Sequence, residues 1–192
     1  MYKYIYMLIL ISGIFINGCE ENLVGDSFNT FGKLIPLEDG NSWEYLVTNY
    51  DSLGIVSSYF SYKDSVLSDT IINNDSWYKI SNNNDYRLYR LFRNQIGGYY
   101  LYDSTKSSKE SLVFKYPCEV GDTSIYTQVI RVNIKINVNS KEYNCIQYRQ
   151  YLMNIKMQYF DYYISPGIGV VRIQNFENQN LLQDFSLIKL KI

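Results

Sequence analysis

The chain has 192 residues with nearly balanced charge, 18 lysines and arginines against 19 aspartates and glutamates, and it contains no histidine. Balanced charge without a long basic run argues against a nucleic-acid partner. The lack of histidine removes the commonest general base and metal ligand and excludes Ser-His-Asp and Cys-His catalysis. The 21 tyrosines and 9 phenylalanines, with many isoleucines and valines, favour pleated sheet.

The N-terminus has the pattern of a secretion signal that ends at a cysteine. Lys3 supplies a positive charge, residues 5–16 are almost entirely apolar, and Asn17-Gly18-Cys19 follows. A signal needs only about 7 to 15 apolar residues, whereas a membrane span needs about 20. The sequence therefore predicts a signal peptide over residues 1–18 that is removed from the mature protein.

The order Ile16-Asn17-Gly18-Cys19 resembles the lipobox of bacterial lipoproteins. In that family the cysteine sulfur takes a diacylglycerol, the preceding peptide is cut, and the new amine is usually acylated, often with palmitate. The resemblance implies lipid attachment at Cys19, a tether over residues 19–33 and a membrane partner reached through the acyl chains. The alternative is an ordinary secreted protein cut near Gly18, in which the cysteine is incidental.

The acidic residues after the cysteine are informative about the cellular location of the protein. Glu20 and Glu21 resemble the signal by which some Gram-negative lipoproteins reach the outer face of the outer membrane. The alternative is a solvated tether. We expect a lipid-anchored protein of the outer membrane, and the choice between its periplasmic face and the cell surface stays open.

The mature chain, 192 minus 18 or 174 residues, has the size of one domain. The clearest strand is 129–138, in which isoleucine and valine alternate with polar residues. Asn, Asp and Gly separate the strand-like runs, which predicts a meander of antiparallel hairpins over residues 34–192. About ten strands cannot stay flat, so we expect an all-β domain with one strongly curved antiparallel sheet, a half-barrel or irregular barrel. The runs are 43–48, 57–67, 77–81, 86–93, 99–103, 111–116, 129–138, 143–151, 157–164, 170–176 and 185–192.

Two segments echo each other at a constant offset of 81 residues. Residues 36–42, PLEDGNS, align with residues 117–123, PCEVGDT, and in both a glycine lies four residues after a proline. We interpret each as a corner between strands. A site lined by Glu38 and Glu119 is the alternative interpretation, and duplication stays open because shared turn chemistry alone gives such matches.

The chain also resembles uncharacterised bacterial lipoproteins and periplasmic proteins. The resemblance rests on Pro36-Leu37, Gly40-Asn41 and Trp43-Glu44-Tyr45 near the start and on residues 162–171, YYISPGIGVV, near the end. It implies a curved sheet of the half-barrel type seen in lipoprotein-carrier proteins, and it implies no known activity. The chain departs from the pattern at Ser124 and Ile125, where many relatives have an aromatic residue.

Catalytic and metal-binding motifs are absent from the sequence. No phosphate-binding loop and no cysteine pair with zinc spacing occurs, so we expect no cofactor and no metal. Paired carboxylates could still hydrolyse a glycoside, but scattered carboxylates are mostly solvated, and we expect a protein that is not an enzyme. The candidate carboxylates are Asp51, Asp64, Asp69, Glu110 and Asp161.

Cys118 and Cys145 remain once lipid takes Cys19. An exported address permits one disulfide between them, but sequence does not place their Cα atoms within bonding distance. Two buried free thiols are the favoured alternative.

Two classes of function remain open. In the first, the domain binds or carries an apolar, glycan or peptide ligand on a concave sheet; in the second, it is a structural or interaction lipoprotein whose core is filled and whose edges or loops meet another envelope protein. Any single tyrosine more often fills a core than binds a ligand, and Tyr99 and Tyr100 cannot both face inward. The candidate ligand-binding residues are Tyr45, Tyr89, Tyr100, Tyr102 and Tyr159.

Overall fold

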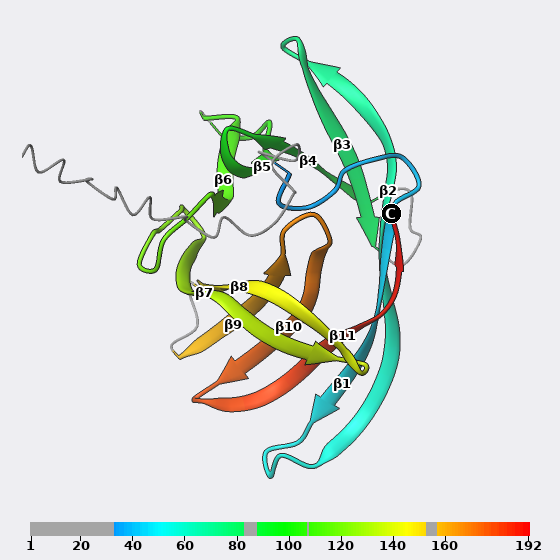
Figure 1. The fold of residues 1–192 in the computed structure, drawn as a ribbon, viewed down its shortest axis with the longest axis vertical. Helices are drawn as coiled ribbons and strands as arrows, with labels where there is room; N and C mark the ends of the chain where they lie inside the picture. The colour runs from blue at the N-terminus through cyan, green and yellow to red at the C-terminus, as the bar shows by residue number, and fades with distance from the viewer. Residues whose placement is uncertain (1–32, 83–87, 107, 153–156) are drawn as a thin grey trace, which may run out of the picture.

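The structure, a computed structural model, describes residues 33–82, 88–106, 108–152 and 157–192 (Figure 1). This part of the chain contains strands, turns and loops and no helix, so none of it is a helix that could cross a bilayer. The predicted signal peptide, Cys19 and nearly all of the predicted tether lie outside the described residues.

Eleven strands form one antiparallel sheet. Each of the eleven runs identified in the sequence contains or overlaps one strand, which is one more than the approximate count of ten. The strands are β1 (Ser42–Tyr50), β2 (Val56–Ile72), β3 (Asp75–Asn82), β4 (Tyr89–Gln95), β5 (Gly97–Tyr102), β6 (Glu110–Tyr116), β7 (Thr127–Val138), β8 (Lys141–Tyr151), β9 (Gln158–Ser165), β10 (Gly169–Glu177) and β11 (Asn180–Lys191).

The sheet order is β6-β5-β4-β3-β2-β1-β11-β10-β9-β8-β7. Every strand therefore pairs with its neighbour in sequence except β6 and β7, and the first and last strands pair with each other in the middle of the sheet. The sheet curls into a nearly closed barrel whose one seam lies between β6 and β7 (Figure 1). The predicted all-β fold with one strongly curved antiparallel sheet is confirmed.

Alternation along the strands sets an inner and an outer face of the sheet. On β1, Tyr45 and Val47 face the core and lie opposite Leu187 and Phe185 of β11. On β7 the regular alternation is interrupted, because the register with β8 shifts twice and Asn133 has φ of 53°. Such bulges re-aim side chains and increase the local twist of the strand.

A row of aromatic rings crosses the interior. We call Phe92, Tyr99, Phe114 and Tyr148 the aromatic ladder; successive ring centroids lie 4.9, 6.1 and 4.9 Å apart. Tyr99, Phe114 and Tyr148 are each at most 5% exposed. Tyr99 faces this core while Tyr100 is only partly buried, as expected for neighbours on a strand.

Side chains, with little strand pairing, close the seam between β6 and β7. The Thr127 and Ser124 hydroxyls donate to the carbonyl of Val113 at 2.6 and 2.8 Å. The Tyr148 hydroxyl donates to the carbonyl of Lys115 at 2.8 Å. These bonds occupy β6 carbonyls that would otherwise offer acceptors to another strand.

The two echoing segments have the same turn geometry. The second lies between β6 and β7, as expected for a corner between strands, whereas the first precedes β1 and no described strand comes before it. Gly40 and Gly121 have φ of 84° and 92°, a region that favours glycine. Their amides donate to the carbonyls of Val66 and Val129 at 3.1 and 2.9 Å. In both corners the next residue's amide donates to the carbonyl of the glutamate three positions earlier.

Candidate functional site

The segment before the first corner is packed into one end of the barrel. Leu34, Ile35 and Leu37 are at most 6% exposed, because their apolar side chains complete the core at this end. Asn94 of β4 holds the segment by accepting from the amide of Leu34 at 3.1 Å and donating to the carbonyl of Ile35 at 2.8 Å. Lys33, the first described residue, therefore lies at this end of the domain.

Arg93 lies on the opposite face of β4 from Asn94 and stacks on Trp77, with its guanidinium carbon 4.6 Å from the ring centroid. Its Nη1 lies 2.5 Å from Asp75 Oδ2, and its Nη2 lies 2.7 Å from Glu110 Oε2. Nη2 also donates to Gln95 Oε1 at 2.6 Å. The Arg93 side chain is only 9% exposed, and two carboxylates within bonding distance stabilise the buried cation.

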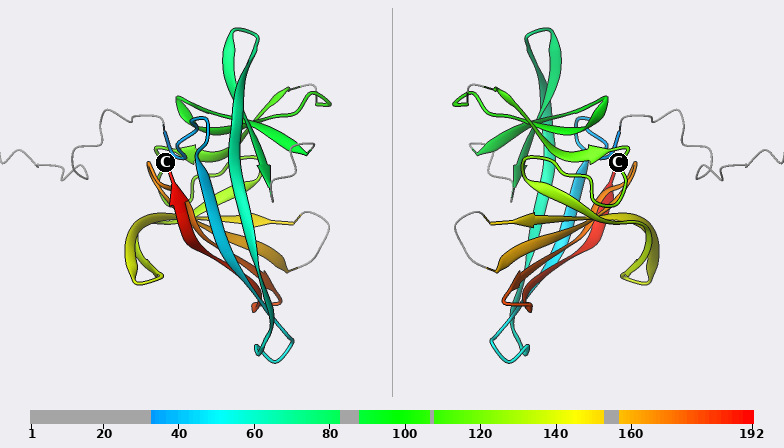
Figure 2. Two further views of the ribbon diagram at one scale, coloured as in Figure 1. Left: turned by 90° about the vertical axis from the view of Figure 1, so that its right-hand side faces the viewer. Right: turned by 90° about the vertical axis from the view of Figure 1, so that its left-hand side faces the viewer.

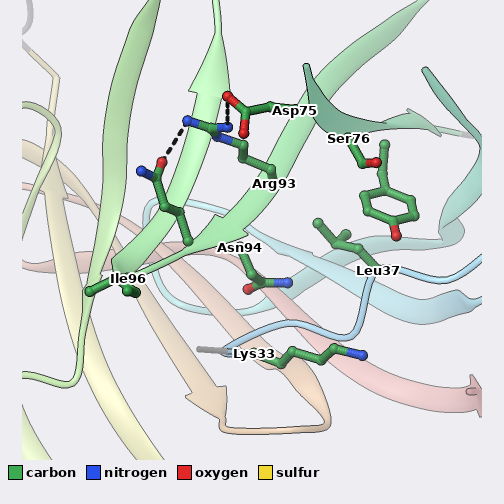
Figure 3. Close-up of a pocket in the computed structure, with 9 residues that line it drawn as sticks. Lys33, Leu37, Asp75, Ser76, Arg93, Asn94 and Ile96 are labelled. Atoms are coloured by element: carbon green, nitrogen blue, oxygen red, sulfur yellow. Dashed lines mark hydrogen bonds and ion pairs between the residues drawn. The ribbon is translucent and has the colours of Figure 1, made fainter. Parts of the chain in front are cut away.

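A cleft of ≈ 450 Å³ opens where this strand end meets the packed N-terminal segment (Figure 3). Arg93 reaches toward Asp75 on one side of β4, and Asn94 lies on the side of Leu37 and Lys33 (Figure 3). The lining residues are Lys33, Leu37, Asp75, Ser76, Tyr78, Arg93, Asn94, Gln95 and Ile96.

The residues that line the cleft favour contact with another protein over catalysis. Arg93 is already paired with two carboxylates, so it is a weak receptor for a further anion, although its Nε has no hydrogen-bond partner among the described residues. Ile96 is 95% exposed and Asp75 is 50% exposed in its side chain. An exposed apolar side chain beside polar groups is typical of protein-contact surfaces.

The five tyrosines singled out in the sequence do not converge. Tyr45 is buried in the core, and its hydroxyl donates to the carbonyl of Val170 at 2.9 Å. The strand register places the other four on the outer face of the sheet, where Tyr100 pairs with the outward Arg93. These four are Tyr89, Tyr100, Tyr102 and Tyr159. A shared concave surface is therefore not what these residues form.

Each of the four outer tyrosines has its own neighbour. Tyr102 packs on Trp77 with centroids 5.3 Å apart, and Tyr159 stacks on Phe176 at 5.0 Å. Tyr89 is 48% exposed and lies under Lys79. Tyr100 pairs with Arg93 across β4 and β5.

Asp64 is the candidate carboxylate with the most perturbed surroundings. It faces inward opposite Trp43, and it accepts a hydrogen bond from the Tyr62 hydroxyl at 2.9 Å. Burial raises the pKa of Asp64 to about 6, although Tyr62 and Arg90 act in the opposite direction. Burial and the neighbouring carboxylate likewise raise the pKa of Tyr62 above its ordinary value.

Three further candidate carboxylates have structural partners. Asp161 binds the Arg149 guanidinium with both oxygens at 2.7 Å, and Glu110 pairs with Arg93. Asp51 accepts from two backbone amides of its own turn. These carboxylates therefore lie in separate places on the sheet, and Asp69 is exposed on β2.

Cys118 and Cys145 are free thiols in the structure. Burial raises the pKa of Cys145 to about 12 and also raises the pKa of Cys118. Neither is then an activated nucleophile, because the thiolate is the reactive form. Within the described ranges, no group of three or more cysteines and carboxylates is placed to hold a metal ion.

Sequence reasoning missed Trp77, Arg93 and Asn94, which organise the cleft. Alternation against Phe92 does predict that Arg93 and Asn94 point to opposite faces. The partners of all three come from other strands or from the N-terminal segment, and one sequence carries no signal for such pairings.

No protein-family model and no curated protein matches the chain. Among solved structures, it is similar to a protein from Bacteroides fragilis that is provisionally described as exported and has a YmcC-like fold. The TM-score is 0.58 at 10% identity, and the match covers 84% of this chain and 100% of the other.

Two more distant likenesses have TM-scores below 0.5. One is to a provisionally assigned lipoprotein from Parabacteroides distasonis, with a TM-score of 0.47, 12% identity, and 83% and 99% of the two chains covered. The other is to the Pseudomonas aeruginosa MucA/MucB complex, with a TM-score of 0.39, 9% identity, and 85% and 54% covered. At these identities the comparisons establish a fold shared with the Bacteroides fragilis protein and no activity.

Proposed function

We propose that the chain is an exported lipoprotein of the outer membrane, anchored through Cys19, that binds another protein of the cell envelope with its outer surface and catalyses no reaction. The main support for this proposal is that the protein's own side chains occupy much of the interior of the sheet. Tyr45 and the aromatic ladder pack across the interior, and the hydroxyls of Tyr45 and Tyr148 bond to backbone carbonyls. The described cleft lies at the end of β4, where the packed N-terminal segment meets the sheet.

The cleft suits a segment of protein. It offers the apolar Ile96, the cationic Lys33 and the half-exposed Asp75 within one opening. A partner segment with an apolar side chain flanked by polar groups could bury Ile96 and hydrogen-bond to the rim charges, which are already paired within the chain, Lys33 with Glu38 at 3.4 Å and Asp75 with Arg93 at 2.5 Å. The fold neighbour from Bacteroides fragilis, itself provisionally described as exported, is compatible with an envelope address.

Photo-crosslinking in cells tests the contact. A photoreactive amino acid at Ile96 should give one defined protein adduct in the envelope fraction. The matched control is Ile188, an isoleucine on β11 that is 46% exposed and away from the cleft. Equal adducts from both positions, or none from Ile96, would contradict the proposed contact surface.

The anchor is tested separately in a Gram-negative host. The wild type should partition with membranes, and Cys19→Ala should not, because only this cysteine follows the apolar segment. If the Cys19→Ala protein stays membrane-bound after a high-salt wash, the lipoprotein assignment is wrong.

A carrier function is the second candidate. Its support is a pair of rings on the inner face, Tyr62 and Phe185, which meet edge to face at 5.9 Å and are only partly buried. An apolar or glycan ligand could cover them. Mass spectrometry of the protein extracted from envelopes should find no stoichiometric ligand if the interaction function holds. A ligand that is lost in a folded Tyr62→Ala variant would support the carrier instead.

A further inference from the structure

The first half of β2 is paired on one side only. β2 pairs with β1 over Val56–Ser65, but it pairs with β3 only over Asp64–Ile72. Over residues 56–61, which we call the open edge, no described strand lies on the side away from β1. Figure 1 shows this stretch of β2 as the outermost strand of its hairpin with β1. Alternate backbone amides and carbonyls there point away from β1.

Large apolar side chains are exposed along this edge and the adjoining turn. The contrast across the strand pair is clear, since Phe60 is 45% exposed while its partner Val47, paired on both sides, is 0% exposed. Exposed apolar side chains gathered on one segment are a mark of an interaction site, and here they lie on both faces of the strand, because Tyr59 and Phe60 are successive residues of β2. The exposed fractions are 80% for Leu53, 60% for Ile55, 53% for Val56 and 75% for Tyr59.

The turn that presents the patch is held in place. Asp51 Oδ1 accepts from the amides of Leu53 and Ile55, both at 2.9 Å, and the Asp51 amide donates to the carbonyl of Ile55 at 2.9 Å. An edge that is ordered before binding loses less conformational entropy when a partner strand adds to it.

The edge also lacks protection by charge or proline, and its irregularity is a register shift with β1 near Val56, at the start of the edge. Exposed edges commonly carry lysine, proline or an inward charge that prevents pairing. Residues 52–62, SLGIVSSYFSY, contain neither a charged residue nor a proline. Two identical edges can therefore approach each other without like-charge repulsion, and each supplies the serines and aromatic rings that pair well across antiparallel strands.

We propose that the open edge docks a second copy of this chain, with the two β2 strands antiparallel about a two-fold axis, so that one continuous sheet runs through both copies. The turn end of the β1–β2 hairpin projects beyond the neighbouring strands (Figure 2). Anchoring in one membrane would raise the effective concentration of the copies. The inference goes beyond the proposed function and does not depend on the cleft.

Cysteine crosslinking of the full-length lipoprotein in cells tests the docking. Near a two-fold axis an antiparallel strand pair brings a residue opposite itself. Of Ser57→Cys, Ser58→Cys and Ser61→Cys, one should give disulfide-linked dimer under mild oxidation at least tenfold above the other two. The matched control is Ser108→Cys, an exposed serine outside β2.

A second substitution distinguishes specific pairing of the two β2 strands from random collision of two copies in the membrane. Tyr59→Lys, at a 75% exposed position, should remove at least nine-tenths of the crosslink by placing two lysines at the joined edge. Should Tyr59→Lys fail to fold, Phe60→Lys replaces it. Dimer no greater than for Ser108→Cys would overturn the inference. So would crosslinks to a different protein, or crosslinks that survive both lysine substitutions.

Discussion

Two strand edges of this sheet, the seam and the open edge, differ in how far side chains cover their backbone groups. The seam joins β6 and β7, the formal ends of the sheet, yet hydroxyls of Ser124, Thr127 and Tyr148 occupy its carbonyls and the aromatic ladder packs beneath it. The open edge belongs to β2, a strand in the middle of the sheet order, and exposes Tyr59 and Phe60. Position in the sheet therefore does not decide which edge is available; side-chain cover does.

The seam is expected to contribute to the stability of the fold, and the open edge to binding. Substitutions at the seam remove bonds between buried or partly buried groups, so they should lower the free energy of unfolding. Substitutions on the open edge touch exposed groups and should leave that free energy nearly unchanged. Four predictions test this contrast, beginning with the largest effect.

Gly98→Ala should be the most damaging change. Gly98 has φ of 144°, and an added Cβ would lie 2.0 Å from the carbonyl oxygen of Phe114, on the strand that forms one side of the seam. The expected cost is more than about 3 kcal/mol in urea unfolding, because backbone must move. Gly54→Ala in the β1–β2 turn is the control: nothing lies within 4 Å of its Cβ, and the cost should be about 1 kcal/mol. Equal costs would contradict the contrast.

Asp64→Asn should change the pH dependence of stability. Asp64 lies where β2 passes from one-sided to two-sided pairing, and burial raises its pKa to about 6. The folded protein then binds more protons than the unfolded chain between about pH 4 and 6, so stability falls as pH rises through that window. The variant should be about 2 kcal/mol more stable at pH 7.5 and equal near pH 4. The control is Asp69→Asn, exposed on β2; an identical gain there would contradict the explanation.

Thr127→Val should weaken the seam by about 1 to 2 kcal/mol, since an isosteric valine cannot donate to the carbonyl of Val113. Thr48→Val, the same change on a strand paired on both sides, should cost less than about 0.5 kcal/mol. Chemical unfolding of both variants provides the measurement. A Thr127→Val protein as stable as wild type would show that the hydroxyl does not hold the seam.

The smallest effect is expected for a pair of Tyr→Phe changes. Tyr148→Phe removes a hydroxyl that is fully buried and leaves the carbonyl of Lys115 without this donor, at a cost of about 1 kcal/mol. Tyr59→Phe removes an exposed hydroxyl and should change thermal stability by less than about 0.5 kcal/mol. A larger loss for Tyr59→Phe would reverse the assignment of the two edges.

Local patterns in the sequence were enough for the strands and the corners. The strand-like runs overlap every described strand, and proline followed by glycine located the turns at Gly40 and Gly121. The seam and the open edge depend on which strands pair and over what length, and pairing is a non-local property. β2 has 17 residues and β3 has 8, a difference that leaves about half of β2 without a described neighbouring strand on one side.

The site was less predictable for a related reason. Tyrosine is common in this chain both inside and outside the sheet, so its abundance did not distinguish Tyr45, which is buried, from Tyr59, which is exposed. Arg93 is defined by contacts with Asp75 and Glu110 on other strands. A charge that is buried through such contacts looks in sequence like any surface arginine.

Hydrogen–deuterium exchange of the purified protein in detergent, at low and high protein concentration, tests the central contrast most directly. In the dilute protein, the backbone amides of residues 56–61 that point away from β1 should exchange much faster than the amides of β6 and β7. At high concentration residues 56–61 should become protected while the seam stays unchanged. Protection of residues 56–61 in the dilute protein equal to that of the seam, or exchange there that ignores concentration, would contradict the account.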